Sequence, residues 1–195
     1  MLSGGKIMGG NPAEKRTELD YYATNPEAVK MLLAAHPFNG KKILEPCVGA
    51  GHIAKVLKDY FGEDVIGIDI VDRGFAPTIV ENFLDWETSD SFDTIITNPP
   101  YSLASEFIEK CIDLLEPGGQ LAMFLKIQFL EGVKREQLFK RYPPKYLYVF
   151  TKRMCVFNNG VEVDPKTGKP WATTLCNAWY VWEKGFAGEP TIRWI

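Results

Sequence analysis

Residues 94–102, TIITNPPYS, place a polar amide and two prolines directly after a run of Ile and Thr. Asn98 offers an amide oxygen, and Pro99 and Pro100 form a rigid corner that has carbonyl groups but no N–H donors. Tyr101 adds a flat aromatic face. Two acceptors beside a stacking surface suit a planar group that carries an NH2, because accepting both hydrogens frees the nitrogen lone pair to attack an electrophile. An ordinary strand-ending turn is the alternative interpretation.

A glycine-rich turn, EPCVGAGHIA at residues 45–54, is a second candidate site. Gly49, Gly51 and Ala54 fit G-x-G-x-x-A, a strand-to-helix turn that lets a nucleotide cofactor approach the backbone closely. Asp69 follows 18 residues beyond Gly51, at the end of the next expected strand. A carboxylate there is placed to accept hydrogen bonds from two ribose hydroxyls. The pattern predicts an adenosine-type cofactor, with a capping or turn aspartate as the alternative for Asp69.

Strands and helices alternate along the chain. Apolar residues at helical spacing predict helices at 27–35, 53–61, 104–115 and 131–141. Short apolar runs predict seven strands, at KKILEP, DVIGIDI, TIVEN, FDTIIT, QLAMFLK, KYLYVFT and NAWYVWEKG. The last two strands have no helix between them, which indicates one antiparallel strand. The pattern therefore predicts an α/β fold, a mostly parallel seven-stranded sheet with helices on both faces.

Ligands of such sheets bind beyond the carboxyl ends of the strands. The glycine turn, Asp69 and Asn98 all fall at this edge of the predicted sheet. Asp85 also falls there, after TIVEN, where a carboxylate is placed to accept a hydrogen bond from an adenine amino group. A surface aspartate before the acidic loop ETSDSFD is the alternative interpretation of Asp85.

Length and composition bound the class of protein. A chain of 195 residues, 46% hydrophobic and 24% charged, fits one compact domain, which we expect over residues 17–195 after a flexible glycine-rich arm at 1–16. No apolar run approaches the roughly 20 residues of a membrane span, and no signal peptide is recognisable. The four cysteines form no C-x-x-C and only two histidines are present. We therefore expect no metal site, no membrane association, and free thiols in a reducing cytoplasm.

The charge pattern leaves a nucleic-acid contact open. The formal net charge is −3, yet the segment 120–153 holds eight basic residues against two acidic ones. A basic patch would bind the phosphates of a nucleic acid, whereas a solvated helix face is equally compatible with the pattern. The basic residues are Lys126, Lys134, Arg135, Lys140, Arg141, Lys145, Lys152 and Arg153.

EPCVGAGHIA followed by NPPY resembles the amino-methyltransferases that use S-adenosylmethionine, in particular the adenine-N6 DNA methyltransferases. The resemblance extends from DYYATNPEAV to AWYVWEKG. The order of the upstream segment, the glycine motif and NPPY matches the gamma arrangement, and the run FLEGVKREQLFKRYPP is similar to small phage and prophage enzymes. The resemblance implies a Rossmann-like class I methyltransferase fold in a single catalytic domain. It also implies S-adenosylmethionine as cofactor and methyl transfer to N6 of adenine in DNA by base flipping. The location that it implies is the cytoplasm of a bacterial or phage-infected cell.

The same resemblance implies roles for individual residues. The catalytic corner comprises Asn98, Pro99, Pro100 and Tyr101, in which Asn98 and the Pro99 carbonyl accept hydrogen bonds from the target amine and Tyr101 stacks on its ring. Asp69 is expected to bind the cofactor ribose and Asp85 the cofactor adenine. Other expected cofactor contacts are Tyr22, Thr24, Pro26, Glu45, Pro46, Gly49, Gly51, Ile70 and Phe107, the last closing over the cofactor. Expected substrate contacts are Phe157, as a second wall of the target pocket, Lys134, Arg135 and Arg153.

The sequence departs from the gamma pattern in one respect. Those enzymes usually carry a separate target-recognition domain, whereas here the last expected strand ends the chain and only residues 1–16, 127–145 and 158–176 are spare. Relaxed specificity, a partner subunit or second copy, or a non-DNA substrate is therefore expected, with DNA favoured over RNA. The alternatives are an RNA amino-methyltransferase, a protein glutamine methyltransferase, and an inactive cofactor-binding subunit of a heterodimer. The intact N-P-P-Y argues against the last.

Overall fold

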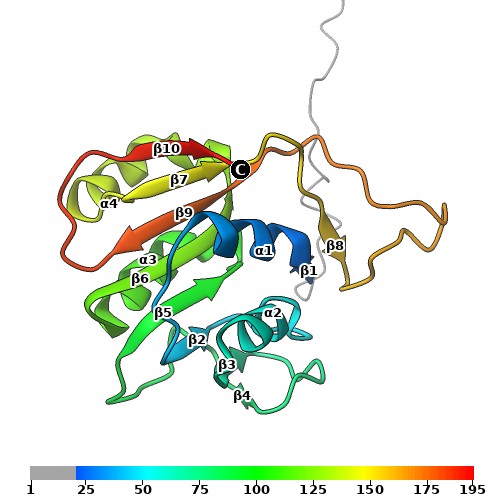
Figure 1. The fold of residues 1–195 in the computed structure, drawn as a ribbon, viewed down its shortest axis with the longest axis horizontal. Coiled ribbons are helices and arrows are strands. Elements are labelled where there is room, and N and C mark those ends of the chain that lie inside the picture. The colour runs from blue at the N-terminus through cyan, green and yellow to red at the C-terminus, as the bar shows by residue number, and fades with distance from the viewer. Residues whose placement is uncertain (1–20) are drawn as a thin grey trace, which may run out of the picture.

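The computed structural model describes residues 21–195, and an eight-stranded sheet runs through its centre in the order β10-β7-β9-β6-β5-β2-β3-β4 (Figure 1). Only β9 is antiparallel to its neighbours. All seven predicted strands are present, and the mixed, mostly parallel sheet confirms the predicted fold class. The strands are β2 (Ile43–Glu45), β3 (Val65–Asp69), β4 (Thr78–Val80), β5 (Phe92–Thr97), β6 (Leu115–Lys126), β7 (Tyr146–Val149), β9 (Asn177–Glu183) and β10 (Thr191–Trp194). The predicted arm at 1–16 lies outside the described residues.

The eighth strand, β10, corrects the expectation that the chain ends with the strand NAWYVWEKG. β10 pairs in parallel with β7, with Thr191 opposite Tyr146. Its four residues are all exposed, so it lacks the buried alternation that marks the other strands in the sequence. Ile195 then continues the contact with the β7 side, where the backbone N–H and the hydroxyl of Thr151 both donate to the Ile195 carbonyl, at 2.7 and 3.1 Å.

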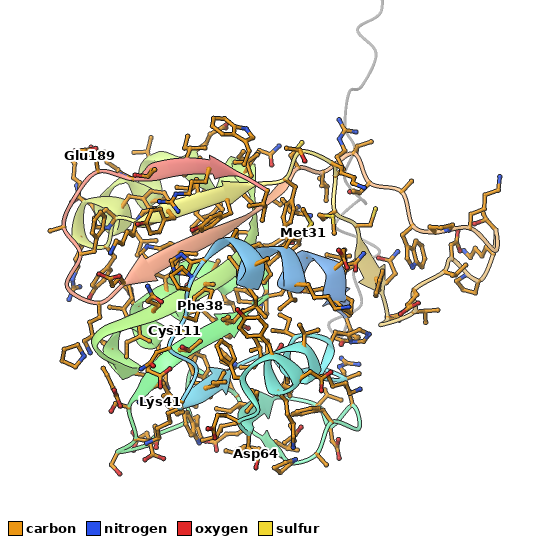
Figure 2. The ribbon with its side chains drawn as sticks, in the orientation of Figure 1. Met31, Phe38, Lys41, Asp64, Cys111 and Glu189 are labelled. Atoms are coloured by element: carbon orange, nitrogen blue, oxygen red, sulfur yellow. The ribbon has the colours of Figure 1, made fainter. Side chains whose placement is uncertain are left out.

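Four helices cover the two faces of the sheet, as predicted. They are α1 (Pro26–Ala35), α2 (His52–Phe61), α3 (Ala104–Leu114) and α4 (Glu136–Arg141). Helices α1 and α2 pack on one face in a core that contains Leu32, Leu57 and Trp179, and α3 and α4 pack on the other in a core that contains Cys111 and Tyr180. Figure 2 shows side chains filling the layers between these helices and the sheet. No helix in the described part of the chain has both the length and the apolar character needed to cross a membrane.

Two predicted element boundaries were wrong. The predicted helix 131–141 begins only at Glu136, because Gly132, with φ +115°, interrupts it. A short 3-10 turn, Val133–Arg135, replaces its first part, and another, Ile127–Leu130, precedes it. The strand predicted at QLAMFLK begins earlier, at Leu115. Residues Pro117–Gly119 lie in its irregular first part.

A small second sheet joins two segments that lie far apart in the sequence. β1 (Tyr22–Thr24) and β8 (Val156–Asn158) pair antiparallel, with Ala23 opposite Phe157. After β8 the chain runs out from the body and returns to β9, and Figure 1 shows this excursion as the gold-to-orange loop on the right. We call residues 159–172 the ribbon, because a β-bridge between Val163 and Pro170 joins its two arms. The sequence predicts only a turn-rich stretch here.

Candidate active site

Asn98 lies directly beyond the carboxyl end of β5, and its amide has one defined orientation. The Nδ2 atom donates a hydrogen bond to the backbone carbonyl of Tyr22 in β1, at 3.0 Å. Since a carbonyl only accepts, the contact identifies the NH2 side of the amide and leaves Oδ1 as the acceptor for another molecule. The structure thus places Asn98 at the carboxyl edge of the sheet, and its role as an acceptor for a target amine stays a prediction.

The rest of the N-P-P-Y corner leads straight into α3. Pro99 is buried, Pro100 is exposed, and a 3-10 turn at Tyr101–Leu103 precedes the helix. Burial raises the pKa of the Tyr101 hydroxyl, which stays protonated at neutral pH. The Nζ atom of Lys126, the last residue of β6, lies 5.1 Å from the centre of the Tyr101 ring. Lys126 was predicted as part of a basic segment, and its place against Tyr101 depends on the pairing of β5 with β6.

The glycine turn after β2 requires its glycines. Gly49 and Gly51 have φ values of +53° and +78°, in the left-handed region that favours glycine. A Cβ atom on Gly49 would lie 2.4 Å from the Tyr21 ring, and one on Gly51 would lie 2.2 Å from the ring of Phe75. Helix α2 begins at His52, immediately after the turn. The two glycines therefore allow the turn conformation and the close packing of Tyr21 and Phe75 against it, while the approach of a cofactor to this backbone stays a prediction.

Asp69 ends β3 and is tied to the same turn. Its Oδ2 atom accepts from the Gly49 backbone N–H at 2.8 Å, and its Oδ1 atom accepts from the Val71 N–H at 3.1 Å. Each carboxylate oxygen keeps a further lone pair, so the group retains capacity for ligand hydroxyls. The neighbouring Ile70 is 59% exposed, which leaves an apolar surface beside the carboxylate.

Glu45, at the end of β2, supplies an unsatisfied acceptor. It is 1% exposed, and its Oε2 atom has no hydrogen-bond partner among the described residues. Burial raises the pKa of this carboxyl well above its usual range, although the Ala54 backbone N–H acts in the opposite direction. The hydroxyl of Thr24 in β1 is likewise buried and unpaired. A ligand with an ammonium group would satisfy such groups, so the donor and acceptor set fits the methionine end of S-adenosylmethionine.

Tyr21 is a contact that sequence reasoning missed. Its hydroxyl accepts from the Ala50 N–H at 3.0 Å and lies 3.1 Å from Nδ1 of His52. Burial lowers the pKa of His52. This favours a neutral ring, whose Nδ1 atom can accept a hydrogen bond from the Tyr21 hydroxyl. Arg73 lies over the Tyr21 ring, 4.6 Å from its centre. The signal was the aromatic pair in DYYATNP, of which only Tyr22 was chosen.

Two expected cofactor contacts are placed differently from the expectation. Phe107 is 3% exposed and packs on Phe83 in the core, with ring centres 4.9 Å apart. In this position it is not a lid that closes over a ligand. Asp85 is exposed in the turn after β4, and its Oδ2 atom accepts from Nδ2 of Asn82 at 2.6 Å. Asn82, which lies closer to the end of β4, was not among the predicted residues. Pro46 is buried next to the glycine turn, and Pro26 is the first residue of α1.

The expected substrate contacts do not gather in one place. Phe157 is buried in β8, with its ring 6.1 Å from that of His52, on the side of the glycine turn. The guanidinium of Arg135 donates to the carbonyls of Phe129 and Glu131, so it holds its own loop together. Lys134 lies in a groove with the first turns of α3. These three roles remain predictions.

The basic residues of the segment 120–153 also differ in their surroundings: some form ion pairs and others are exposed without one among the described residues. Lys140 pairs with Glu136 at 2.6 Å and Lys145 with Glu183 at 2.7 Å, so these charges are partly neutralised. Lys152 and Arg153 are exposed just after β7, at the base of the excursion that carries the ribbon. Within residues 21–195, no group of three or more His, Cys, Asp or Glu side chains is placed to hold a metal ion.

Sequence comparison identifies methyltransferases as relatives, while no protein-family model matches the chain. The type II methyltransferase M.CvrRI of Paramecium bursaria Chlorella virus XZ-6E is 31% identical over 123 residues, which cover 49% of this chain and 32% of the relative. The type II methyltransferase M.TthHB8I of Thermus thermophilus is 24% identical over 159 residues, 61% of this chain and 37% of the relative. The chain thus matches about a third of the length of these curated relatives.

Structure comparison shows the fold. A methyltransferase from Pyrococcus furiosus superposes with a TM-score of 0.55 at 17% identity, over 88% of both chains. An S-adenosylmethionine-dependent O-methyltransferase from Thermotoga maritima gives 0.56 at 18% identity, over 90% of this chain and 69% of the other. The M protein of the type I restriction enzyme EcoKI gives 0.57 at 17% identity, over 87% and 45%. The fold is therefore that of the class I S-adenosylmethionine-dependent methyltransferases, as predicted.

Proposed function

We propose that this chain binds S-adenosylmethionine and methylates the exocyclic amino group of a nucleic-acid base, N6 of adenine in DNA. The orientation of Asn98 is the observation that carries the proposal. Its NH2 group is held by the Tyr22 carbonyl, so Oδ1 is free to accept a hydrogen bond beside the carbonyl of Pro99. The relatives named as type II methyltransferases and the fold of the EcoKI M protein support DNA as the substrate.

The cofactor would lie across the carboxyl ends of β2 and β3. Glu45 and Thr24 would contact its methionine end, and the backbone of the glycine turn would pack against it. Asp69 and Ile70 would contact the ribose and the adenine ring. When bound, the cofactor supplies an electrophilic methyl group on a sulfonium sulfur.

The chain's own residues would activate the target by position and hydrogen bonding. A flipped adenine would stack on Tyr101 while Asn98 Oδ1 and the Pro99 carbonyl accept its two amino hydrogens. Both acceptors draw the nitrogen out of conjugation with the ring, so its lone pair points at the electrophile. They also stabilise the positive charge that develops on the amine during attack. Positioning of the two reactants supplies the remaining acceleration.

Transfer of a labelled methyl group tests the proposal directly. The protein is incubated with methyl-labelled S-adenosylmethionine and separate pools of DNA, RNA and protein, and each labelled pool is digested and analysed by mass spectrometry. We expect N6-methyldeoxyadenosine from the DNA pool. Label only in RNA or only on glutamine would replace DNA with that substrate, and label in no pool would refute methyl transfer.

A further inference from the structure

The ribbon is the largest feature of the structure that the proposed site leaves unused. Residues 161–170 are all exposed except Asp164, and in Figure 1 they extend beyond the body on the side where the strand arrowheads of β5, β6 and β7 point. A loop that only connected β8 to β9 would not need this length. Its exposure and its place at the carboxyl ends of the strands point to contact with a large ligand.

The ribbon has a defined structure of its own. A β-bridge joins Val163 to Pro170, and the Asp164 backbone N–H donates to the Lys169 carbonyl at 3.0 Å. The Trp171 indole N–H donates to the Val161 carbonyl at 2.6 Å, which ties the two arms together nearer the body. The carboxylate of Asp164 accepts from the Lys166 N–H and the Thr167 hydroxyl and so closes the tip as a turn. The ribbon therefore consists of two arms joined by one β-bridge, with a turn at its end.

The ribbon is also joined to both parts of the proposed site. β8, from which it starts, pairs with β1, and the β1 carbonyl of Tyr22 holds the amide of Asn98. On the other side, the Asn159 N–H donates to the Tyr21 carbonyl at 2.7 Å, and Tyr21 bonds to the glycine turn. A ligand on the ribbon would therefore lie beside the pocket that receives the target amine.

The charge of the ribbon together with its base, residues 152–172, fits a polyanion. Lys166 and Lys169 stand at its tip, and Lys152 and Arg153 at its base. Among residues 21–195 none of these four forms an ion pair. Against these four cations, residues 152–172 hold two carboxylates, Glu162 and Asp164, so the formal net charge of this segment is +2. Unpaired cations on an exposed projection favour binding to phosphates.

The dimensions of the ribbon fit one groove of DNA. The major groove of B-DNA is about 12 Å wide and about 8.5 Å deep, and it admits a two-stranded ribbon. The tip between the bridged residues Val163 and Pro170 is held as a turn by Asp164, and this tip is the part of the ribbon that would enter the groove. The major groove of A-form RNA is too narrow for side chains to read.

We propose that the ribbon enters the major groove of DNA next to the flipped base and is the element through which this chain recognises its target. This inference rests on the proposed function, because it names the substrate of the same site. It places recognition within the chain, where the sequence alone led us to expect relaxed specificity or a partner subunit. A reader of this size contacts few base pairs, so the recognition sequence is short.

Two variants remove the proposed contact without touching the methyltransferase site. One is Lys166→Ala with Lys169→Ala, and the other replaces residues 164–169 by Asn-Gly, a two-residue turn that suits the bridged pair Val163 and Pro170. The matched control is Lys41→Ala with Lys58→Ala. It removes two charges near the amino end of β2 and in the last turn of α2, and Figure 2 shows Lys41 at the lower left, far from the ribbon.

Binding to a DNA duplex of about 30 base pairs is measured by fluorescence anisotropy at several salt concentrations. We expect the Lys166/Lys169 variant to bind at least about tenfold more weakly and to reduce the salt slope by about 2, one per phosphate-contacting lysine. The Asn-Gly variant should behave in the same way. The control should match the wild type. S-adenosylmethionine affinity and thermal stability should be unchanged in all variants, which excludes misfolding.

Equal DNA affinity and equal salt slope in the ribbon variants and the wild type would overturn the inference. So would ribbon-dependent binding of a duplex RNA as tightly as the DNA. The two proposals fail separately. A wild type that binds DNA through the ribbon but transfers no methyl group refutes the function alone, and a wild type that methylates DNA as well as its ribbon variants do refutes the ribbon alone.

Discussion

The cofactor side and the target side of the proposed site are assembled from different kinds of contact. On the cofactor side, made of the glycine turn 45–54 and Asp69, the joining hydrogen bond spans 20 residues of sequence. On the target side, made of the corner 98–101 with β1 and β8, Asn98 reaches a carbonyl 76 residues away. The cofactor side is a compact βαβ unit, whereas the target side depends on the pairing of distant segments. Changes of substrate recognition can therefore occur in the ribbon without disturbing cofactor binding.

Asn98→Ala should give the largest separation of the two sides. It removes an acceptor that is proposed to stabilise the transition state, so kcat should fall by about 10²- to 10³-fold. Affinity for S-adenosylmethionine should be unchanged, as measured by calorimetry. A variant with full turnover would show that the target site lies elsewhere.

Asp69→Ala should produce the opposite pattern. Loss of a charged acceptor for the ribose costs about 1.5–3 kcal/mol, which corresponds to roughly 10- to 150-fold weaker cofactor binding. At saturating cofactor, kcat should remain near that of the wild type. Asp59→Ala is the matched control, because this carboxylate is exposed on α2 and has no expected role in the site. Unchanged cofactor affinity in Asp69→Ala would remove the ribose assignment.

Gly49→Ala and Gly62→Ala sharpen the comparison, because both glycines have positive φ but different surroundings. An added Cβ at Gly62 has nothing within 4 Å, while at Gly49 it meets the Tyr21 ring. The backbone strain of about 1–2 kcal/mol is common to both, and overpacking should cost Gly49→Ala about 1–3 kcal/mol more. Urea unfolding measures the difference. Equal losses of stability would mean that Tyr21 moves away freely.

Glu45 should give the smallest effect, a pH dependence of cofactor binding. Burial raises the pKa of the free carboxyl, so at pH values below that pKa the group is protonated before binding. A bound ammonium would favour the carboxylate, so binding would release a proton. Affinity should then rise with pH, by at most about tenfold per pH unit, until the free carboxyl is itself ionised. Calorimetry in buffers of different ionisation enthalpy counts the proton, and Glu45→Gln should abolish its release.

Local sequence carried the predictions of strand positions, which the structure confirms, while the roles of the residues at the strand ends stay predictions. The glycine turn, Asp69 and Asn98 each follow a buried strand directly, so knowing the strand was enough to place the residue at the ligand edge. The contact of Tyr21 with the glycine turn and the contact of Lys126 with Tyr101 were not predicted. Both exist only after segments that are distant in the sequence come together. β10 is exposed along its whole length and carries no periodic signal. The ribbon takes its meaning from the β1–β8 pairing, which no local pattern indicates.

The position of the last residue matters for how the protein is handled. The Ile195 carbonyl accepts from Thr151, the residue directly before Lys152 and Arg153, and Figure 1 marks the terminus beside the start of the excursion toward β8. A purification tag fused after Ile195 would begin at the proposed DNA-facing edge. Attachment to a sensor surface through such a tag would turn that edge toward the support, and measured DNA affinities would then be too low. Tags for these measurements belong at the other end of the chain or should be cleaved off.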